Sequence, residues 1–143
     1  MTDPLGQSQV IPYLQGLTKL GYQFTIISFE KKERFKKNGS DIRLLLDSSG
    51  IKWEPQLFSK RPPVLAKLYD VWKLNTAVLK LHKKEKFAFT HCRSYIAAGA
   101  GLKLYRRYKI PFLFDIRGFW VDERVDSRQW NLKNPAHFFF FKM

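Results

Sequence analysis

FAFTHCRSYIAAGAGLKLYRRYKIPFLFDI, residues 87–116, places a helix-like segment between two short apolar stretches. Phe87–His91 and Pro111–Ile116 are rich in aromatic and aliphatic residues, which is typical of buried strands. Between them, Ser94 is suited to cap a helix that continues to Tyr108. A strand, a helix and a second strand in this order predict two parallel strands joined by a helix.

The same alternation extends back to the N-terminus. Apolar residues from Val10 to Leu20 recur at helical spacing, and two further stretches read as strands, Phe24–Phe29 and Ile51–Phe58. Ser40–Ser49 reads as a short helix ended by Gly50. A long helix follows Pro63, with an apolar stripe made of Leu68, Val71, Leu74, Val78 and Leu81, broadened by Leu65 and Trp72. The pattern predicts an α/β fold with a doubly wound, Rossmann-like parallel sheet.

A run of very small residues, Ala97–Gly101, lies in the helix that follows Ser94. Two glycines would weaken an isolated helix. Their presence therefore predicts that this helix packs very closely on the sheet.

Composition limits the class of protein. The 143 residues fit one domain, and a hydrophobic content of 45% is ample for a packed core. There are 26 basic and 12 acidic residues, so the formal charge is 26 − 12 = +14. An acidic partner is expected, and nucleic acid, an anionic lipid surface and a phosphorylated small molecule all fit.

The cellular compartment follows from cysteine use and hydropathy. Cys92 is the only cysteine, so no intramolecular disulfide can form, which is typical of a reducing compartment. The first ten residues do not resemble a signal peptide, and no apolar run is long enough for a membrane span. We expect a cytoplasmic protein.

Both ends suggest that the domain continues beyond this chain. Asn134 and Pro135 form a good helix start, and Phe138–Phe141 would need covering by further chain. At the other end, the loop TDPLGQSQ at residues 2–9 has no strand before it, although a doubly wound sheet normally has its first strand in the middle. A central strand is expected to be missing.

Four segments together resemble one family of enzymes, and they cover nearly the whole chain in order. They are DPLGQSQVIPYLQGLTKLGYQFTIISFEK at 3–31, HCRSYIAAGAG at 91–101, PFLFDIRGFWVDERVD at 111–126 and RQWNLKNP at 128–135. This set resembles bacterial glycosyltransferase family 4.

The resemblance implies a GT-B fold, in which two Rossmann-like domains face each other across a cleft. Residues 1–143 would then be part of the N-terminal, acceptor-side domain, and the C-terminal donor-binding domain would be absent. The implied reaction transfers a hexose-type sugar from a nucleotide-sugar co-substrate to a hydroxyl of a glycan or lipid-linked acceptor, in bacterial cell-surface polysaccharide synthesis. No metal or other cofactor is expected, and this chain alone is expected to be inactive.

Two groups of residues are candidates for substrate binding. Gly6, Gln7 and Ser8 lie just before the expected start of the first helix near Ser8, where free backbone N–H groups favour an anion. His91 and Arg93 lie where the strand from Phe87 ends, at the edge of the sheet where ligands of open α/β folds bind. The alternative for the first group is an ordinary turn with a lone glycine. The alternative for the second group is a histidine that only ends its strand and binds no ligand.

The catalytic candidates follow the last predicted strand. Arg117 occupies a position that resembles the cleft-facing His or Arg of family members, and Asp122 and Glu123 supply carboxylates. Such groups would stabilise the charges that develop on the departing diphosphate and on the sugar. Trp120 is a candidate acceptor contact, because aromatic faces stack on sugars. The alternative is a surface pair of Asp115 with Arg117, followed by a solvated loop.

Two further functions stay open. A basic binding module could stack bases on aromatic rings, but no nucleic-acid motif is present and this reading ranks lower. A remnant of a disrupted gene, without catalytic activity, is the other alternative. The basic clusters near Arg34 and Lys83 would also suit peripheral contact with the inner face of a membrane, where a lipid-linked acceptor would lie.

Overall fold

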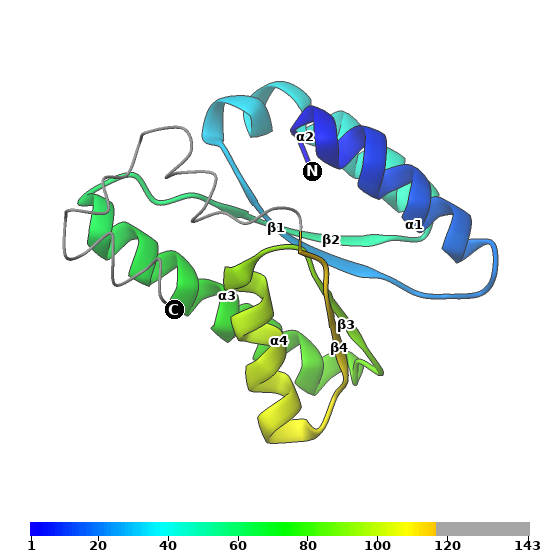
Figure 1. Ribbon diagram of the computed structural model, residues 1–143. Helices are drawn as coiled ribbons and strands as arrows, with labels where there is room; N and C mark the ends of the chain where they lie inside the picture. The colour runs from blue at the N-terminus through cyan, green and yellow to red at the C-terminus, as the bar shows by residue number, and fades with distance from the viewer. Residues whose placement is uncertain (117–143) are drawn as a thin grey trace. The chain divides into compact units, whose positions relative to one another are not determined.

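Helices and strands alternate along the chain, as the sequence predicted, and the fold is mixed α/β (Figure 1). The computed structural model describes residues 1–116, apart from the side chains of residues 63 and 64. It forms two compact units, Met1–Lys80 and Leu81–Met143, and each is described by itself. The elements are a π-helical stretch η1 (Gly6–Val10), α1 (Ile11–Thr18), β1 (Thr25–Glu30), α2 (Lys32–Ser48), β2 (Lys52–Leu57), α3 (Pro63–Glu85), β3 (Thr90–Cys92), α4 (Tyr95–Tyr108) and β4 (Phe112–Phe114).

The first unit is built on the parallel pair β1 and β2. Thr25 lies opposite Lys52, and the register continues to Glu30 opposite Leu57. Helices α1 and α2 cover one face of this pair (Figure 1). Their contact buries the main core of the unit, made of Ile11, Leu14, Ile42, Leu46, Ile51 and Trp53.

Proline 55 marks β2 as an edge strand. The backbone N–H groups of Lys52 and Phe58 donate to the carbonyl oxygens of Phe24 and Glu30, at 3.0 and 3.2 Å. Backbone N–H groups point to opposite sides of a strand at successive residues. Since those of Lys52 and Phe58 point toward β1, the backbone nitrogen of Pro55 points away from β1. Proline has no N–H, so the outer edge of β2 lacks a donor there and is unsuited to a further strand.

The prediction for α2 was wrong at its start and right at its end. The helix begins at Lys32 rather than near Ser40, because Lys, Glu and Arg are good helix formers and not only a charged boundary. Phe35 packs against the core, and a Cβ on Gly39 would lie 3.1 Å from its ring. Gly50, with φ of +69°, follows the end of the helix as expected.

The single apolar stripe predicted for the long helix is divided between two faces of α3. Leu74 is buried, with 8% of its surface exposed. Leu65 and Leu68 are each 62% exposed, and Trp72 is 59% exposed. Spacing alone placed these side chains on one broad stripe, whereas packing covers only the side that contains Leu74.

Polar contacts fix α3 to the end of β2. The Lys73 ammonium donates to the carbonyl oxygen of Leu57 at 2.6 Å and lies 3.1 Å from the Asp70 carboxylate. Asp70 also accepts hydrogen bonds from the backbone N–H and the hydroxyl of Ser59. These bonds hold α3 with the Asp70 and Lys73 side toward the strand.

The second unit is built on the parallel pair β3 and β4, with Thr90 opposite Phe112 and Cys92 opposite Phe114. Helix α4 covers one face very closely, as the small residues predicted. A Cβ on Gly101 would lie 2.7 Å from the Cys92 sulfur and 3.1 Å from the Phe112 ring. Glycine is therefore required for this approach.

The strand before the helix is shorter and later than predicted. It starts at Thr90, because the backbone N–H of Phe87 donates to Nδ1 of His82 instead of to a neighbouring strand. Lys86, with φ of 55°, ends α3 just before this bond.

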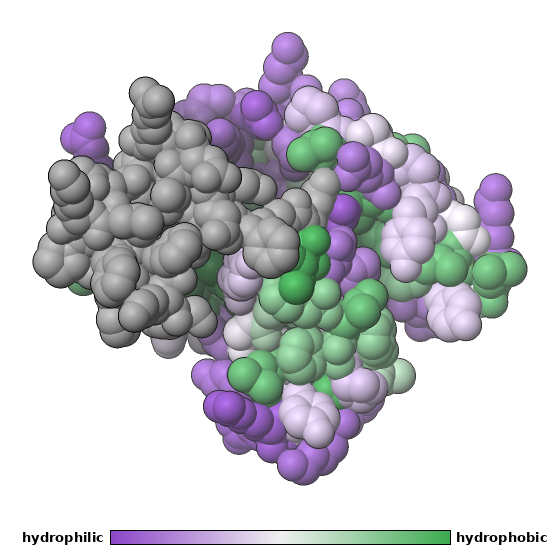
Figure 2. Space-filling model, in the orientation of Figure 1, coloured by the Kyte–Doolittle hydropathy of each residue, from purple (hydrophilic) through white to green (hydrophobic). Residues whose placement is uncertain are grey.

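The other face of the pair carries Leu113, which is 51% exposed, and apolar side chains gather over this part of the molecule (Figure 2). No helix in residues 1–116 is both long and apolar enough to cross a membrane.

Candidate functional site

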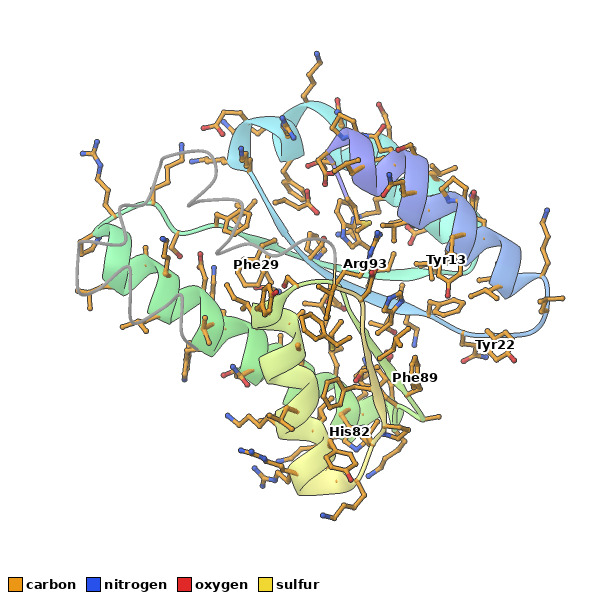
Figure 3. The ribbon with its side chains drawn as sticks, in the orientation of Figure 1. Tyr13, Tyr22, Phe29, His82, Phe89 and Arg93 are labelled. Carbon is orange, nitrogen blue, oxygen red and sulfur yellow. The ribbon has the colours of Figure 1, made fainter. Side chains whose placement is uncertain are left out.

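Three polar side chains meet where β3 and β4 end. Because the two strands are parallel and in register, their carboxyl ends lie at the same edge. His91 lies within β3, Arg93 follows β3, and Asp115 follows β4. Figure 3 shows Arg93 reaching out from the connection between β3 and α4. Ligands of open parallel sheets bind at this edge.

Arg93 and Asp115 form the centre of the site. Nε of Arg93 donates to Oδ2 of Asp115 at 2.9 Å, and Nε2 of His91 lies 3.7 Å from the same oxygen. The backbone N–H of Asp115 donates to the carbonyl oxygen of Cys92 at 2.9 Å, which fixes the carboxylate beside the arginine. The side chains of Arg93, His91 and Asp115 are 27%, 30% and 35% exposed, so all three are accessible to a ligand.

The start of α4 borders this group. The hydroxyl of Ser94 accepts a hydrogen bond from the backbone N–H of Ala97 at 3.1 Å, as its predicted role as a cap requires. The first turn of α4 contains no acidic residue. A helix start carries partial positive charge, which adds to the charge of Arg93. The arrangement is suited chemically to a phosphate or a carboxylate.

Asp115 pairs with Arg93. The sequence had paired it with Arg117 in the alternative of a surface loop, and Arg117 lies outside the described residues. Asp115 is thus a site residue that the sequence argument did not select. The signal was available, because it is the first residue after β4 and faces the residues that end β3. The catalytic candidates Arg117, Asp122 and Glu123, and the candidate sugar contact Trp120, lie outside the described residues.

The expected anion site at Gly6, Gln7 and Ser8 has the wrong local structure. These residues lie inside the first helix, within η1, rather than before it. The backbone N–H of Gly6 donates to the Asp3 carboxylate at 2.9 Å, and that of Gln7 donates to the Asp3 carbonyl oxygen at 3.2 Å. Asp3 therefore already occupies the place in which an anion was expected.

Pro12 accounts for the π-helical turn at the start of this helix. The wider π-helical turn ends with the N–H of Ile11 donating to the carbonyl oxygen of Gly6. Pro12 follows at once, in the first turn of α1. A proline lacks an N–H and would clash with the preceding turn of a regular helix, so the wide turn accommodates it.

A buried carboxylate at the end of β1 was also missed. Glu30 is 2% exposed and accepts hydrogen bonds from the backbone N–H and hydroxyl of Thr2, from Ser28 and from the N-terminal ammonium group. Burial raises the pKa of Glu30, but these hydrogen bonds outweigh it and leave the pKa below its usual value. The carboxylate anchors the first residues to the sheet.

Metal-ligand geometry is not seen in residues 1–116, where no three His, Cys, Asp or Glu side chains form a group able to hold an ion. Cys92 is buried between β3 and α4. Burial raises the pKa of its thiol. Cys92 is therefore a neutral packing residue.

No family model, curated protein or solved structure matches this chain.

Proposed function

We propose that this chain is part of the acceptor-side domain of a GT-B glycosyltransferase, which transfers a sugar from a nucleotide-sugar donor to an acceptor hydroxyl in bacterial cell-surface polysaccharide synthesis. The observation that carries the proposal is the meeting of Arg93, His91 and Asp115 at the carboxyl end of β3 and β4. The resemblance of the quoted motifs to glycosyltransferase family 4 supplies the type of reaction.

Arg93 is proposed to bind an anionic group of a substrate. A guanidinium can hold a carboxylate through Nε and present its other edge to a phosphate. Asp115 then has the role of orienting Arg93, and His91 adds a hydrogen-bonding group on the same side. The phosphate would belong to the nucleotide-sugar donor or to a lipid-linked acceptor.

A doubly wound sheet is the second part of the proposal. Pro55 makes the outer edge of β2 unsuitable for pairing, so a further strand would join at β1. None of the six residues of β1, TIISFE, is exposed, and Glu30 is buried, which is expected of a strand that lies inside a sheet rather than at its edge. These features leave room for a further parallel strand beside β1, as a doubly wound sheet requires.

The chemistry is assigned by the resemblance. Transfer builds negative charge on the departing diphosphate and positive charge on the sugar carbon. Arg117 is proposed to stabilise the negative charge on the departing diphosphate. Asp122 and Glu123 are proposed to stabilise the positive charge on the sugar carbon or to bind the acceptor hydroxyl. Trp120 is proposed to stack on the acceptor.

The first experiment is to follow the reading frame on both sides of this segment. Continuation into an apolar strand upstream and a second Rossmann-like domain downstream is expected. The complete product should then transfer labelled sugar from one member of a panel of nucleotide sugars to a glycan or lipid-linked acceptor. Stop codons close to both ends would leave a binding module or a gene remnant as the explanation.

Arg93→Lys in the complete enzyme tests the site itself. Lysine keeps the charge but loses the planar fork, so we expect KM for the phosphate-bearing substrate to rise roughly tenfold with kcat little changed. Arg107→Lys, at the other end of α4, is the matched control and should leave both constants unchanged. An unchanged KM in the Arg93 variant would remove Arg93 from the binding site.

A further inference from the structure

Helix α3 exposes an apolar face in its first half. Leu65, Leu68, Tyr69 and Trp72 recur at steps of three and four residues, so they lie on one side of the helix, which we name the outer face. Their exposed fractions are 62%, 62%, 52% and 59%. The buried Leu74 lies on the opposite side. The outer face therefore contributes little to the core of this unit.

The outer face is aromatic as well as aliphatic. The rings of Tyr69 and Trp72 are stacked, with centroids 5.5 Å apart and planes inclined by 22°. Together with two exposed leucines these rings make the outer face apolar, and each ring also carries one polar group, a phenol O–H or an indole N–H. Tryptophan and tyrosine side chains of this kind concentrate at the boundary between lipid tails and headgroups.

Charge around the outer face is positive. Residues 60–80 contain five basic residues and one acidic residue. Lys60 pairs with Glu33 and Lys73 with Asp70, which leaves an excess of three cations, Arg61, Lys67 and Lys80. The acidic residue, Asp70, is held toward β2 by Ser59 and Lys73, so it does not lie on the outer face. Exposed Thr76 and Lys80 continue the outer face in steps of four, and exposed Arg61 precedes the helix. An apolar strip bordered by cations complements an anionic lipid surface.

Other partners fit this face less well. Four side chains cannot supply the roughly 800 Å² per partner that a stable protein interface needs. Nucleic acid would use the rings and the cations, but it offers nothing to Leu65 and Leu68. An anionic lipid surface accommodates the leucines, the aromatic rings and the bordering cations together.

We propose that the outer face of α3 docks onto an anionic membrane surface, with α3 lying parallel to the membrane plane. Leu65, Leu68 and Trp72 would enter the boundary region, and Lys80 would contact the headgroups. This inference does not depend on the proposed transferase activity, and it locates the peripheral membrane contact that the basic clusters led us to expect.

The test is sedimentation of the 143-residue chain with lipid vesicles. Vesicles of equal parts phosphatidylglycerol and phosphatidylcholine should carry the protein down, and vesicles of phosphatidylcholine alone should carry little. Binding to the anionic vesicles should weaken as salt is raised, because the lysine and arginine contacts are screened. Equal binding to both kinds of vesicle would overturn the anionic part of the proposal.

Single substitutions distinguish binding through the outer face from non-specific binding by other exposed apolar side chains. Leu68→Ser and Trp72→Ser should each weaken partition about tenfold, since burying one such side chain is worth about one factor of ten in affinity. Lys80→Gln should weaken it roughly fivefold. Leu44→Ser on α2 is the matched control, because Leu44 is 69% exposed but lies off this face, and it should bind as the unchanged protein does.

The far-UV circular dichroism of each variant confirms that it is folded. Equal losses in Leu44→Ser and Leu68→Ser would overturn the assignment of the outer face. If light scattering shows a dimer and Leu68→Ser abolishes it, the partner of the outer face is a second copy of this chain, and the membrane proposal is overturned. Binding to duplex RNA that Trp72→Ser abolishes, with no vesicle binding, would also overturn the proposal.

Discussion

At the scale of single residues, glycine positions in α4 give the sharpest test of the packing. We expect Gly101→Ala to lower the free energy of unfolding by about 1–3 kcal/mol, because the added methyl group would press against the Cys92 sulfur and the Phe112 ring. Gly99→Ala is the control in the same helix, since nothing lies within 4 Å of the new Cβ. It should stabilise by about 0.5–1 kcal/mol, because alanine is the better helix former. Urea denaturation of both variants measures the difference, and equal effects would contradict the close approach of α4.

Histidine 82 predicts a dependence of stability on pH. It is 7% exposed, and its Nδ1 accepts the backbone N–H of Phe87, which only an imidazole without a proton on that nitrogen can do. Burial, with a smaller effect of Lys86, holds the pKa of His82 below its usual value. The unfolded chain therefore takes up the proton first as the pH falls. The stabilisation is complete above about pH 6.5 and decreases as the pH falls from there toward the lower pKa of the folded state.

The measurement is the urea midpoint at about pH 7.5 and about pH 5.5. His82→Gln keeps an acceptor but cannot titrate, so its midpoint should fall less between these two conditions. A fall of the same size in both proteins would assign the pH dependence to other groups.

At the scale of elements, the start of α4 is testable through its cap. The Ser94 hydroxyl satisfies the backbone N–H of Ala97, so Ser94→Ala should destabilise by about 1 kcal/mol. Ser48 is the control, because its hydroxyl is exposed and bonds only to Leu45 within α2. Ser48→Ala should change the free energy of unfolding by less than about 0.5 kcal/mol. Similar losses in both variants would show that the serine at the start of α4 is not acting as a cap.

Element order was predictable, whereas several boundaries were not. Runs such as FTIISF and PFLFDI are short and apolar, and they predicted strands whose pairing partners are now visible. The start of α2 was missed because a charged run such as EKKER is equally compatible with a loop and with an exposed helix turn. The start of β3 was missed because the hydrogen bond from Phe87 to His82 depends on the end of α3, which local sequence does not encode.

At the scale of the whole molecule, the net charge of +14 is the dominant property. Like charges repel more strongly in the compact state than in the unfolded chain, and salt screens this repulsion. We expect the melting temperature to rise as sodium chloride is increased from low concentration to about 0.3 M. Sodium fluoride at the same ionic strength should act equally if screening is the cause. A falling melting temperature would mean that the ion pairs, such as that of Lys60 with Glu33, outweigh the repulsion.

The sequence by itself determined the alternation of helices and strands, the cap at Ser94, the glycine that follows α2 and the need for small residues in α4. These features depend on local propensity and on contacts between near neighbours in the chain. Only the tertiary structure decided that Asp115 holds Arg93, that Asp3 fills the place expected for an anion, and that α3 leaves Leu68 and Trp72 uncovered. The sequence offers several carboxylates that could pair with an arginine or accept a backbone N–H, and several apolar side chains that could be buried. Which of them do so depends on how the elements pack in three dimensions.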